Sequence, residues 1–442
     1  MKENVRNDPH FFALRDKPLK HNFQKGDVLV LFGELFQRGY ANGLVDLAES
    51  YQMTIVRTTV GRRDHDGNSR PLTQEEIDLI PQPFINISLE AGFDFELDQN
   101  GQCPNDYLKS VKLTEWTQAK IPDSTIQESL KNGQARFRAS IKKFIVELEQ
   151  IIRPAIESGR HIHFAHTMAG GVPRVKIVMP LMNRVFKGKE DRFLTSQEFL
   201  ESNIGQFMLL NFNEITAKTF DILIEESTEL RLKIEKHNGT VSYVAYGYHG
   251  TEIMVENDLR WQSYAPYIQG WAKVELENYS KKWSQLGVQC CVYNCPEILT
   301  NSSSIFKGVE IPLYNLIRSL QKIKPNHLMT KKITEDCQNI LKNPDDLNLI
   351  FKAIDDYINF SEEVGTSQYK NWPQHSQKDQ LAKTLQLSDY VVSLHQNENQ
   401  LMTAVLSELI FKSCGFIMLH DGFKPKNSVS WIGHDAIVNC MD

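Results

Sequence analysis

The stretch Asp27-Val-Leu-Val-Leu-Phe-Gly33 is an apolar run that ends in glycine, and such a run predicts a buried β-strand. Apolar residues at helical spacing follow from Leu44 to Tyr51, and residues 53–60 return to β-branched side chains. A strand, a helix and a second strand in this order form a βαβ unit, whose two strands must be parallel. This segment therefore predicts a parallel sheet covered by helices.

The same alternation continues outward from this unit. Further short apolar runs predict strands at 84–89, 161–164, 241–245 and 288–293, and helical patterns occur at 126–152, 197–226 and 267–285. Alternating strands and helices predict an α/β fold with a doubly wound parallel sheet of the Rossmann type.

Two segments differ from this alternation. Residues from about 64 to 120 are rich in Gly, Pro, Asn and Asp and predict insertions, whereas the pattern after residue 331 is mostly helical. We therefore expect a Rossmann-type catalytic domain over 1–330 and a mostly helical C-terminal extension over 331–442.

Composition narrows the functional classes. The chain has 442 residues, 41% of them hydrophobic, and a net charge of −6, which argues against a dedicated nucleic-acid binder. Seven scattered cysteines do not suggest a disulfide framework, and neither a signal peptide nor a membrane span is evident. These features predict a cytoplasmic protein.

The turn between the first strand and the first helix contains Gly33, Gly39 and Gly43. Glycine lets backbone amides approach a pyrophosphate closely, and a helix that starts near Tyr40 would direct its positive end at the phosphates. The spacing departs from G-x-G-x-x-G, so a purely structural turn is the alternative. In this βαβ context the turn favours dinucleotide binding.

Arg62 and Arg63 follow the second predicted strand. Arginine at this position can pair with the 2′-phosphate of NADPH, whereas an acidic residue would accept the 2′-hydroxyl of NADH. We therefore expect NADPH to be preferred over NADH, with two solvated surface arginines as the alternative.

Tyr264 precedes Lys273 by nine residues, which would place the two side chains on opposite faces of a continuous helix. Pro266 favours a helix that begins after Tyr264, so the tyrosine lies in a loop and can turn back toward the lysine. Tyr267 is the rival residue because it is nearer to Lys273 in sequence.

This Tyr-x8-Lys arrangement, together with Val244-Ala-Tyr-Gly-Tyr-His-Gly-Thr-Glu-Ile253 ahead of it, resembles the FabV-type enoyl-ACP reductases and the related trans-2-enoyl-CoA reductases. Ala165-His-Thr-Met-Ala-Gly-Gly-Val-Pro-Arg174 and Ile298-Leu-Thr-Asn-Ser-Ser-Ser304 are similar to other parts of that family's pattern. The chain looks like a divergent relative within the short-chain dehydrogenase/reductase superfamily, and the FabMG reductases are a candidate group for it.

The resemblance implies that the protein transfers hydride from NADPH or NADH to the β-carbon of a 2-enoyl thioester in fatty-acid synthesis. Negative charge then develops on the thioester oxygen, and a hydroxyl group stabilises it. The implied roles are Tyr264 as this donor, Lys273 at the cofactor ribose, Tyr248 as a second donor, Ala169 and Gly170 against the nicotinamide, and Thr300 at the cofactor amide or phosphates.

Two other functions are compatible with the same sequence features. A carbonyl reductase of the same superfamily would use the same Tyr/Lys pair, and a non-catalytic dinucleotide-binding protein would need no donor. The substrate could carry either acyl carrier protein or coenzyme A.

Two further patterns have plain structural interpretations. His161, His163 and His166 cluster, but they lack the further ligands of a metal site, so we expect packing or hydrogen bonds and no metal. The apolar stripe from Leu313 to Leu320 fits either the core or a wall of an acyl-chain pocket.

Overall fold

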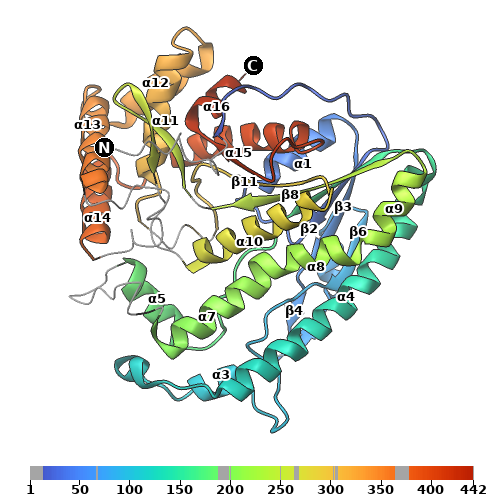
Figure 1. The fold of residues 1–442 in the computed structure, drawn as a ribbon. Helices are drawn as coiled ribbons and strands as arrows, with labels where there is room; N and C mark the ends of the chain where they lie inside the picture. Colours follow the sequence, from blue (N-terminus) through green and yellow to red (C-terminus); the bar gives the residue numbers. More distant parts are fainter. Residues whose placement is uncertain are drawn as a thin grey trace.

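The computed structural model describes residues 13–65, 68–187, 199, 201–248, 250–262, 268–301, 303, 307–363 and 378–441 (Figure 1). Its centre is an eight-stranded sheet in which neighbouring strands are parallel. From edge to edge the sheet runs β1 (Ala13–Leu14), β12 (Val429–Ile432), β11 (Cys290–Asn294), β8 (Thr240–Gly247), β7 (His161–His166), β2 (Val28–Phe32), β3 (Thr54–Thr59) and β6 (Phe84–Ser88).

The strand order explains where a ligand can bind. From β6 across to β11, the main strands follow the 3-2-1-4-5-6 order of dinucleotide-binding sheets. The order reverses between β2 and β7, and a crevice forms outside the carboxyl ends of such strands. The predicted doubly wound fold is confirmed.

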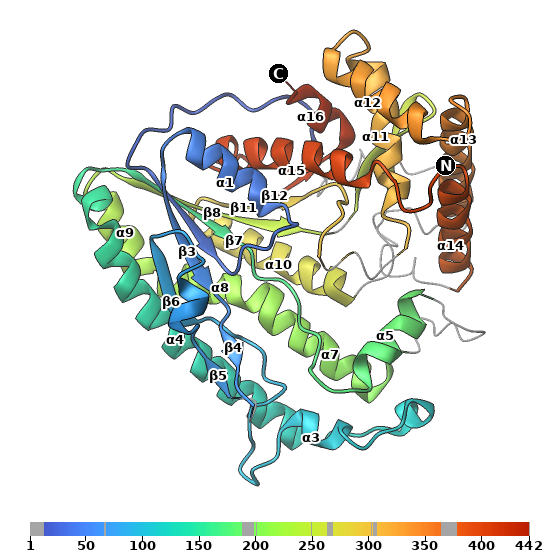
Figure 2. The same cartoon turned by 180° about the vertical axis from the view of Figure 1, so that it is seen from behind.

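Helices cover both faces of the sheet, because alternate residues of each strand point to opposite faces. Leu29 and Leu31 belong to one buried cluster with α1 (Ala41–Ser50), α11 (Glu310–Ile323), α15 (Thr403–His420) and α16 (His434–Asn439). Val28 and Val30 face the other cluster, which includes α4 (Asp123–Glu157), α8 (Thr219–Glu226), α9 (Thr228–Lys236) and α10 (Ile268–Gln285). Figures 1 and 2 show these two helical layers on either side of the sheet.

The structure of the C-terminal segment differs in part from the helical extension that the sequence predicts. Residues 331–442 are mostly helical as expected, with α12 (Leu328–Ile340), α13 (Asp346–Glu363) and α14 (Lys378–Ser393) forming an outer group. However, β12 lies inside the main sheet between β11 and β1, and α15 packs on α1. The end of the chain is therefore part of the Rossmann-type core, because its strand supplies pairing that β11 would otherwise lack.

The segment expected to hold insertions contains one strand of the sheet and several short elements. The predicted strand at 84–89 forms edge strand β6. The other elements are β4 (Arg62–Arg63), which pairs with β5 (Ser69–Arg70), then α2 (Gln74–Ile77), α3 (Pro104–Leu108) and a 3-10 helix (Leu113–Gln118). A third buried cluster joins this region to α5 (Val178–Lys187) and α7 (Asn203–Asn213).

The remaining elements complete the chain. A π-helix (Glu214–Lys218) connects α7 to α8, and β9 (Thr251–Val255) forms an antiparallel pair with β10 (Asp258–Gln262). Among the described residues, α15 alone is long and apolar enough to cross a membrane, and 56% of it is buried within the protein.

The apolar stripe of α11 belongs to the core. Leu313, Leu316, Ile317 and Leu320 are fully buried in the cluster shared with α1 and α15. The structure thus favours the packing interpretation of this stripe over an acyl-chain wall.

Candidate active site

A cavity opens at the carboxyl ends of β2, β7, β8 and β11, where the sheet order predicts a ligand site. It encloses about 1030 Å³, including the part that is open to solvent. Four loops contribute its walls, together with Lys273 from α10. Its lining consists of Glu34, Phe36, Arg38, Gly39, Tyr40, Ala41, His166, Thr167, Ala169, Tyr246, Gly247, Tyr248, Lys273, Glu297, Ile298, Thr300, Asn301 and Ser303.

The three glycines of the first turn have different surroundings. A Cβ atom built on Gly39 meets nothing within 4 Å, so this backbone faces open space in the cavity. A Cβ on Gly43 would lie 1.9 Å from the carbonyl oxygen of Phe411, where α1 crosses α15. A Cβ on Gly33, which has φ +121°, would lie 2.5 Å from the Thr167 hydroxyl oxygen.

These surroundings indicate a binding role for Gly39 and packing roles for Gly33 and Gly43. Gly39 leaves space for the predicted close approach of a ligand to the backbone, and this contact stays a prediction. Gly43 does not line the cavity, and its missing side chain lets two helices touch, which corrects its predicted phosphate contact. Gly33 also lies outside the lining and permits close packing of the loop after β7.

Tyr40 stands where α1 begins. No side chain caps the first turn of this helix, although the amides of Asn42 and Gly43 donate to the carbonyl oxygens of Gly39 and Tyr40 at 3.3 and 3.1 Å. The positive end of the helix dipole lies on the cavity side. The Tyr40 hydroxyl donates to the carbonyl oxygen of Pro296 at 2.7 Å, and the ring stacks on Tyr246 with centroids 5.6 Å apart. This helix terminus can hold an anionic group.

Lys273 is a buried cation on the cavity wall. Its side chain is 4% exposed, and no described residue forms a hydrogen bond or an ion pair with its ammonium group. Burial lowers the pKa of Lys273 to about 7. A buried ammonium group without a partner is costly, so this lysine fits a position that a polar ligand completes.

Tyr248 and Glu297 form a polar pair between the loops that follow the neighbouring strands β8 and β11. The Tyr248 hydroxyl, just after β8, donates to Oε1 of Glu297, after β11, at 2.9 Å. Glu297 is 8% exposed, and burial raises the pKa of its carboxyl group to about 7. The cavity therefore contains a carboxyl group that can be protonated near neutral pH.

The loop after β7 places one of its two predicted residues in the cavity. Ala169 lines it, whereas Gly170 lies outside the lining, and the Thr216 hydroxyl donates to the Gly170 carbonyl oxygen at 3.0 Å. His166 also lines the cavity, and its Nε2 lies 2.8 Å from the hydroxyl oxygen of Thr219. Burial, and then the charge of Lys273, lower the pKa of His166.

The other clustered histidines have hydroxyl partners, in agreement with the hydrogen bonds expected from the sequence. His161 Nδ1 lies 2.6 Å from the Thr240 hydroxyl, and His163 Nδ1 lies 2.7 Å from the Ser242 hydroxyl. Within the described ranges, no group of three or more His, Cys, Asp or Glu residues is arranged to hold a metal ion.

The loop after β11 presents Thr300 to the cavity. The Thr300 and Ser303 hydroxyls lie 3.1 Å apart, and Ser303 Oγ donates to the Ile298 carbonyl oxygen at 3.0 Å. These bonds hold the loop in a compact turn, so the predicted position of Thr300 at the site agrees with the structure.

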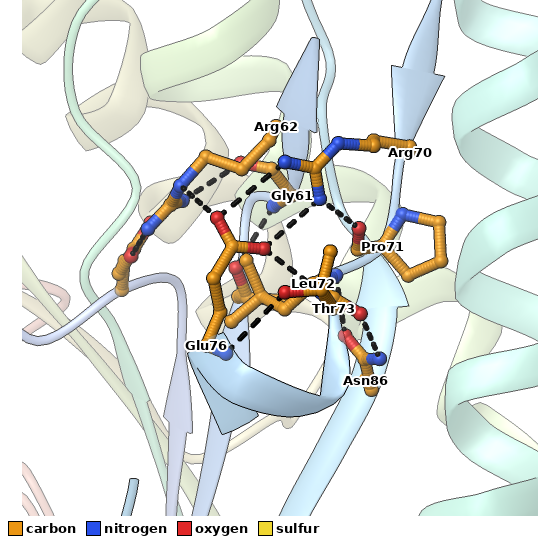
Figure 3. Close-up of polar contacts among 10 residues, drawn as sticks. Gly61, Arg62, Arg70, Pro71, Leu72, Thr73, Glu76 and Asn86 are labelled. Carbon is orange, nitrogen blue, oxygen red and sulfur yellow. Dashed lines mark hydrogen bonds and ion pairs between the residues drawn. The ribbon is translucent and has the colours of Figure 1, made fainter. Parts of the chain in front are cut away.

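Arg62 lies outside the cavity lining and is paired with carboxylates. Its guanidinium group makes a bidentate contact with Glu34, at 2.8 Å and 3.0 Å, and its Nε lies 3.9 Å from Glu76. Figure 3 shows Arg62 and Arg70 converging on Glu76, with the Thr73 backbone completing the cluster. The hydrogen bond from Arg70 is the main cause that lowers the pKa of Glu76 to about 2.

Arg63 is engaged in a similar way. Its Nε donates to Glu90 at 2.8 Å, and its guanidinium carbon lies 4.4 Å from the centre of the Phe95 ring. Both arginines therefore have carboxylate partners, and a contact with a 2′-phosphate would have to compete with these partners.

The structure brings together six of the predicted residues: Gly39, Tyr40, Ala169, Tyr248, Lys273 and Thr300 line one cavity. Tyr264 and its rival Tyr267 lie outside the described residues. Sequence reasoning missed Glu34, His166, Tyr246 and Glu297. The signal that could have identified these four residues is that each lies shortly after a predicted strand.

Comparisons with known proteins show which family the chain is similar to. The family model "Enoyl-acyl carrier protein reductase FabMG" matches residues 10–441. An apo structure of a FabMG enoyl-acyl carrier protein reductase shares 38% sequence identity at a TM-score of 0.90, and the alignment covers 100% of this chain and 97% of that one. An NADH-bound FabMG structure shares 34% identity at a TM-score of 0.76, with 99% and 98% covered. No curated protein sequence matches the chain.

Proposed function

The chain belongs to the FabMG family of enoyl-acyl carrier protein reductases, and from this premise we propose that the cavity at the ends of β2, β7, β8 and β11 is its active site. The observation that carries the proposal is Lys273, a buried ammonium group without a described partner that lines the same cavity as the open backbone of Gly39. Such an arrangement favours a ligand with both hydroxyl and phosphate groups.

We propose NADH as that ligand. The first turn of α1, open at Gly39, would accept the pyrophosphate, and Lys273 would hold ribose hydroxyls. A FabMG structure with 34% identity to this chain has NADH bound. When bound, the cofactor supplies the hydride that reduces the carbon–carbon double bond.

The charge near the first turn favours NADH over NADPH. Glu34 lines the cavity directly after Gly33 and is paired with Arg62, so the pair carries no net charge that would attract a 2′-phosphate, while the carboxylate oxygens can still accept a hydrogen bond from a hydroxyl group. Arg62 is already engaged by Glu34 and adds no unpaired positive charge. This replaces the NADPH preference that the sequence alone suggested.

The enolate oxygen formed by hydride addition needs a hydrogen-bond donor. We assign this role to Tyr264, as expected from the Tyr-x8-Lys pattern, with Lys273 as the cation that lowers the pKa of the phenol. Tyr248 is the second donor, because it lines the same cavity and carries a hydroxyl group. Ala169 and Thr300 would contact the nicotinamide part of the cofactor.

The substrate is the thioester of acyl carrier protein that the family name specifies, and we place the reaction in the cytoplasm. A coenzyme A thioester carries the same reacting group and is therefore a useful test compound.

The proposal is tested by following the oxidation of NADH and NADPH with an enoyl-acyl carrier protein, the matching enoyl-coenzyme A and a panel of ketones. We expect NADH to be consumed with the enoyl thioesters and not with ketones. Consumption with ketones alone would indicate a carbonyl reductase. NADH binding without reduction of any compound would indicate a non-catalytic protein.

A further inference from the structure

The hydrogen bond between Tyr248 and Glu297 constrains what Tyr248 can do. A phenol has a single proton, and in this structure Tyr248 donates it to Oε1 of Glu297. While that bond is made, the same proton is not available to a substrate oxygen. The proposed role of Tyr248 as a second donor therefore depends on the state of Glu297.

An ionised carboxylate only accepts hydrogen bonds, whereas a protonated carboxyl group can donate one. If Glu297 carries a proton, it can donate to the Tyr248 oxygen, and the Tyr248 proton can then turn toward the thioester. If Glu297 is ionised, the Tyr248 hydroxyl stays hydrogen-bonded to the carboxylate. The pair thus has two arrangements, and only one of them serves the reaction.

We propose that Glu297 is a positioning residue that acts through Tyr248, and that its protonated form is required for Tyr248 to donate to the thioester oxygen. This inference rests on the proposed function of the cavity. It adds the protonation of Glu297, which does not belong to the Tyr/Lys pair, as a requirement for the reaction.

The surroundings of Glu297 keep the protonated form within reach at neutral pH. The side chain is 8% exposed, and among the described residues no basic side chain forms an ion pair with it. The groups that act on it are Tyr248, which donates to it, the buried carboxyl group of Glu310 on α11, and the phenol of Tyr40 at the start of α1. Burial and the charge of Glu310 raise its pKa to about 7, and the Tyr248 bond opposes them.

Lys273 titrates in the same range, so the experiment must separate two groups. Burial lowers the pKa of Lys273 to about 7, and its cationic form is the one proposed to act. If both protonated groups are required, log kcat falls with a slope approaching −2 above neutral pH. Removing one of the two requirements changes this slope to −1.

The test is the pH profile of kcat for the unmodified enzyme and for Glu297→Gln, measured with saturating NADH and enoyl thioester. Glutamine has nearly the same shape, and its amide can donate to the Tyr248 oxygen at every pH, as the protonated acid would. We expect log kcat of Glu297→Gln to fall with a slope of −1 above neutral pH. At pH 8 it should retain about ten times the fraction of its low-pH activity that the unmodified enzyme retains.

Tyr248→Phe provides the second variant. If Glu297 acts through this hydroxyl, Tyr248→Phe lowers kcat and also reduces the slope to −1, and adding Glu297→Gln to it has no further effect. The NADH dissociation constant should stay unchanged in all three variants, because none of them alters the proposed cofactor contacts.

The inference is overturned if Glu297→Gln and Tyr248→Phe both keep the pH profile of the unmodified enzyme. It is also overturned if Glu297→Gln changes the Tyr248→Phe enzyme as much as it changes the unmodified one. Either result leaves the proposed function intact, since enoyl reduction is still observed. Failure of the unmodified protein to reduce enoyl thioesters would instead contradict the proposed function.

Discussion

Two regions near the first turn of the sheet hold buried or half-buried cations in opposite circumstances. In the cavity, Lys273 is 4% exposed and has no hydrogen-bonding or charged partner among the described residues. In the β4–β5 hairpin, Arg62 pairs with Glu34, and both Arg62 and Arg70 approach the carboxylate of Glu76, as Figure 3 shows for Glu76. The sequence suggested a ligand-binding role for both Arg62 and Lys273.

The two regions differ in whether the cation has a carboxylate partner. A cation that already has carboxylate partners gains little from a ligand, and such solvent-exposed pairs contribute little to stability. A buried cation without a counter-charge is destabilising until a ligand or a proton change relieves it. We therefore expect changes in the cavity to affect function and changes in the hairpin to have small effects.

The largest expected effect is at Tyr264, which the Tyr-x8-Lys pattern predicts to be the hydrogen-bond donor. Tyr264→Phe removes one hydroxyl group and keeps the ring, so its loss should cost about 3–4 kcal/mol of barrier, or 10²–10³ in kcat. Steady-state kinetics with NADH and an enoyl thioester measure this effect.

Tyr267→Phe is the matched control, because it removes the same group three residues away and should leave kcat near normal. A large loss in the control together with a normal Tyr264→Phe enzyme would move the catalytic role to Tyr267.

The next effect is expected at Gly39, where the backbone faces the cavity. Gly39→Val adds a side chain where nothing lies within 4 Å, so folding should be unaffected while the space for a pyrophosphate is filled. We expect NADH affinity to fall by roughly 10- to 100-fold, measured by fluorescence titration, because blocked phosphate contacts are charge-assisted hydrogen bonds.

Gly43→Ala should lower the stability of the fold, in contrast to Gly39→Val, which should lower NADH affinity. Its new Cβ would overlap the carbonyl of Phe411 at 1.9 Å, so the variant should lose about 2–3 kcal/mol of stability. Thermal unfolding measures that loss. Equal stability of the Gly39 and Gly43 variants would show that α1 and α15 do not need this close contact.

The smallest effect is expected at Arg62 in the hairpin. Arg62→Ala breaks its pairing with Glu34 but removes no proposed cofactor contact, so NADH affinity should change by less than about threefold. Titration with both cofactors checks this. A tenfold loss confined to NADPH would restore the 2′-phosphate role that the sequence first suggested for this arginine.

The sequence was sufficient to predict the sheet because its information is local. The run at 27–33 and the helical spacing after it determine a βαβ unit without reference to distant residues. The same local reasoning placed Gly39, Tyr40, Tyr248 and Lys273 at strand or helix ends that the fold then brings to one cavity.

What the sequence could not predict depends on distant partners. The partner of Arg62 is 28 residues away and that of Arg63 is 27 residues away, so nothing near them indicated that they were paired. Gly43 resembles a phosphate-binding glycine until α15 is placed beside it. Glu297 is a single acidic residue in a polar loop, and only its hydrogen bond to Tyr248 distinguishes it.

The most direct test of the account is Lys273→Met, with NADH affinity and thermal stability measured on the same protein. The lysine pKa is near 7 in the folded protein, below the ordinary 10.5, so its burial costs stability below about pH 7 and this cost disappears as the pH rises toward 10.5. We predict that at pH 6 Lys273→Met melts at the same or a higher temperature than the unmodified protein, while NADH binds at least about tenfold more weakly. A lower melting temperature with unchanged NADH affinity would contradict the account, because it would show that Lys273 stabilises the fold and does not contact the cofactor.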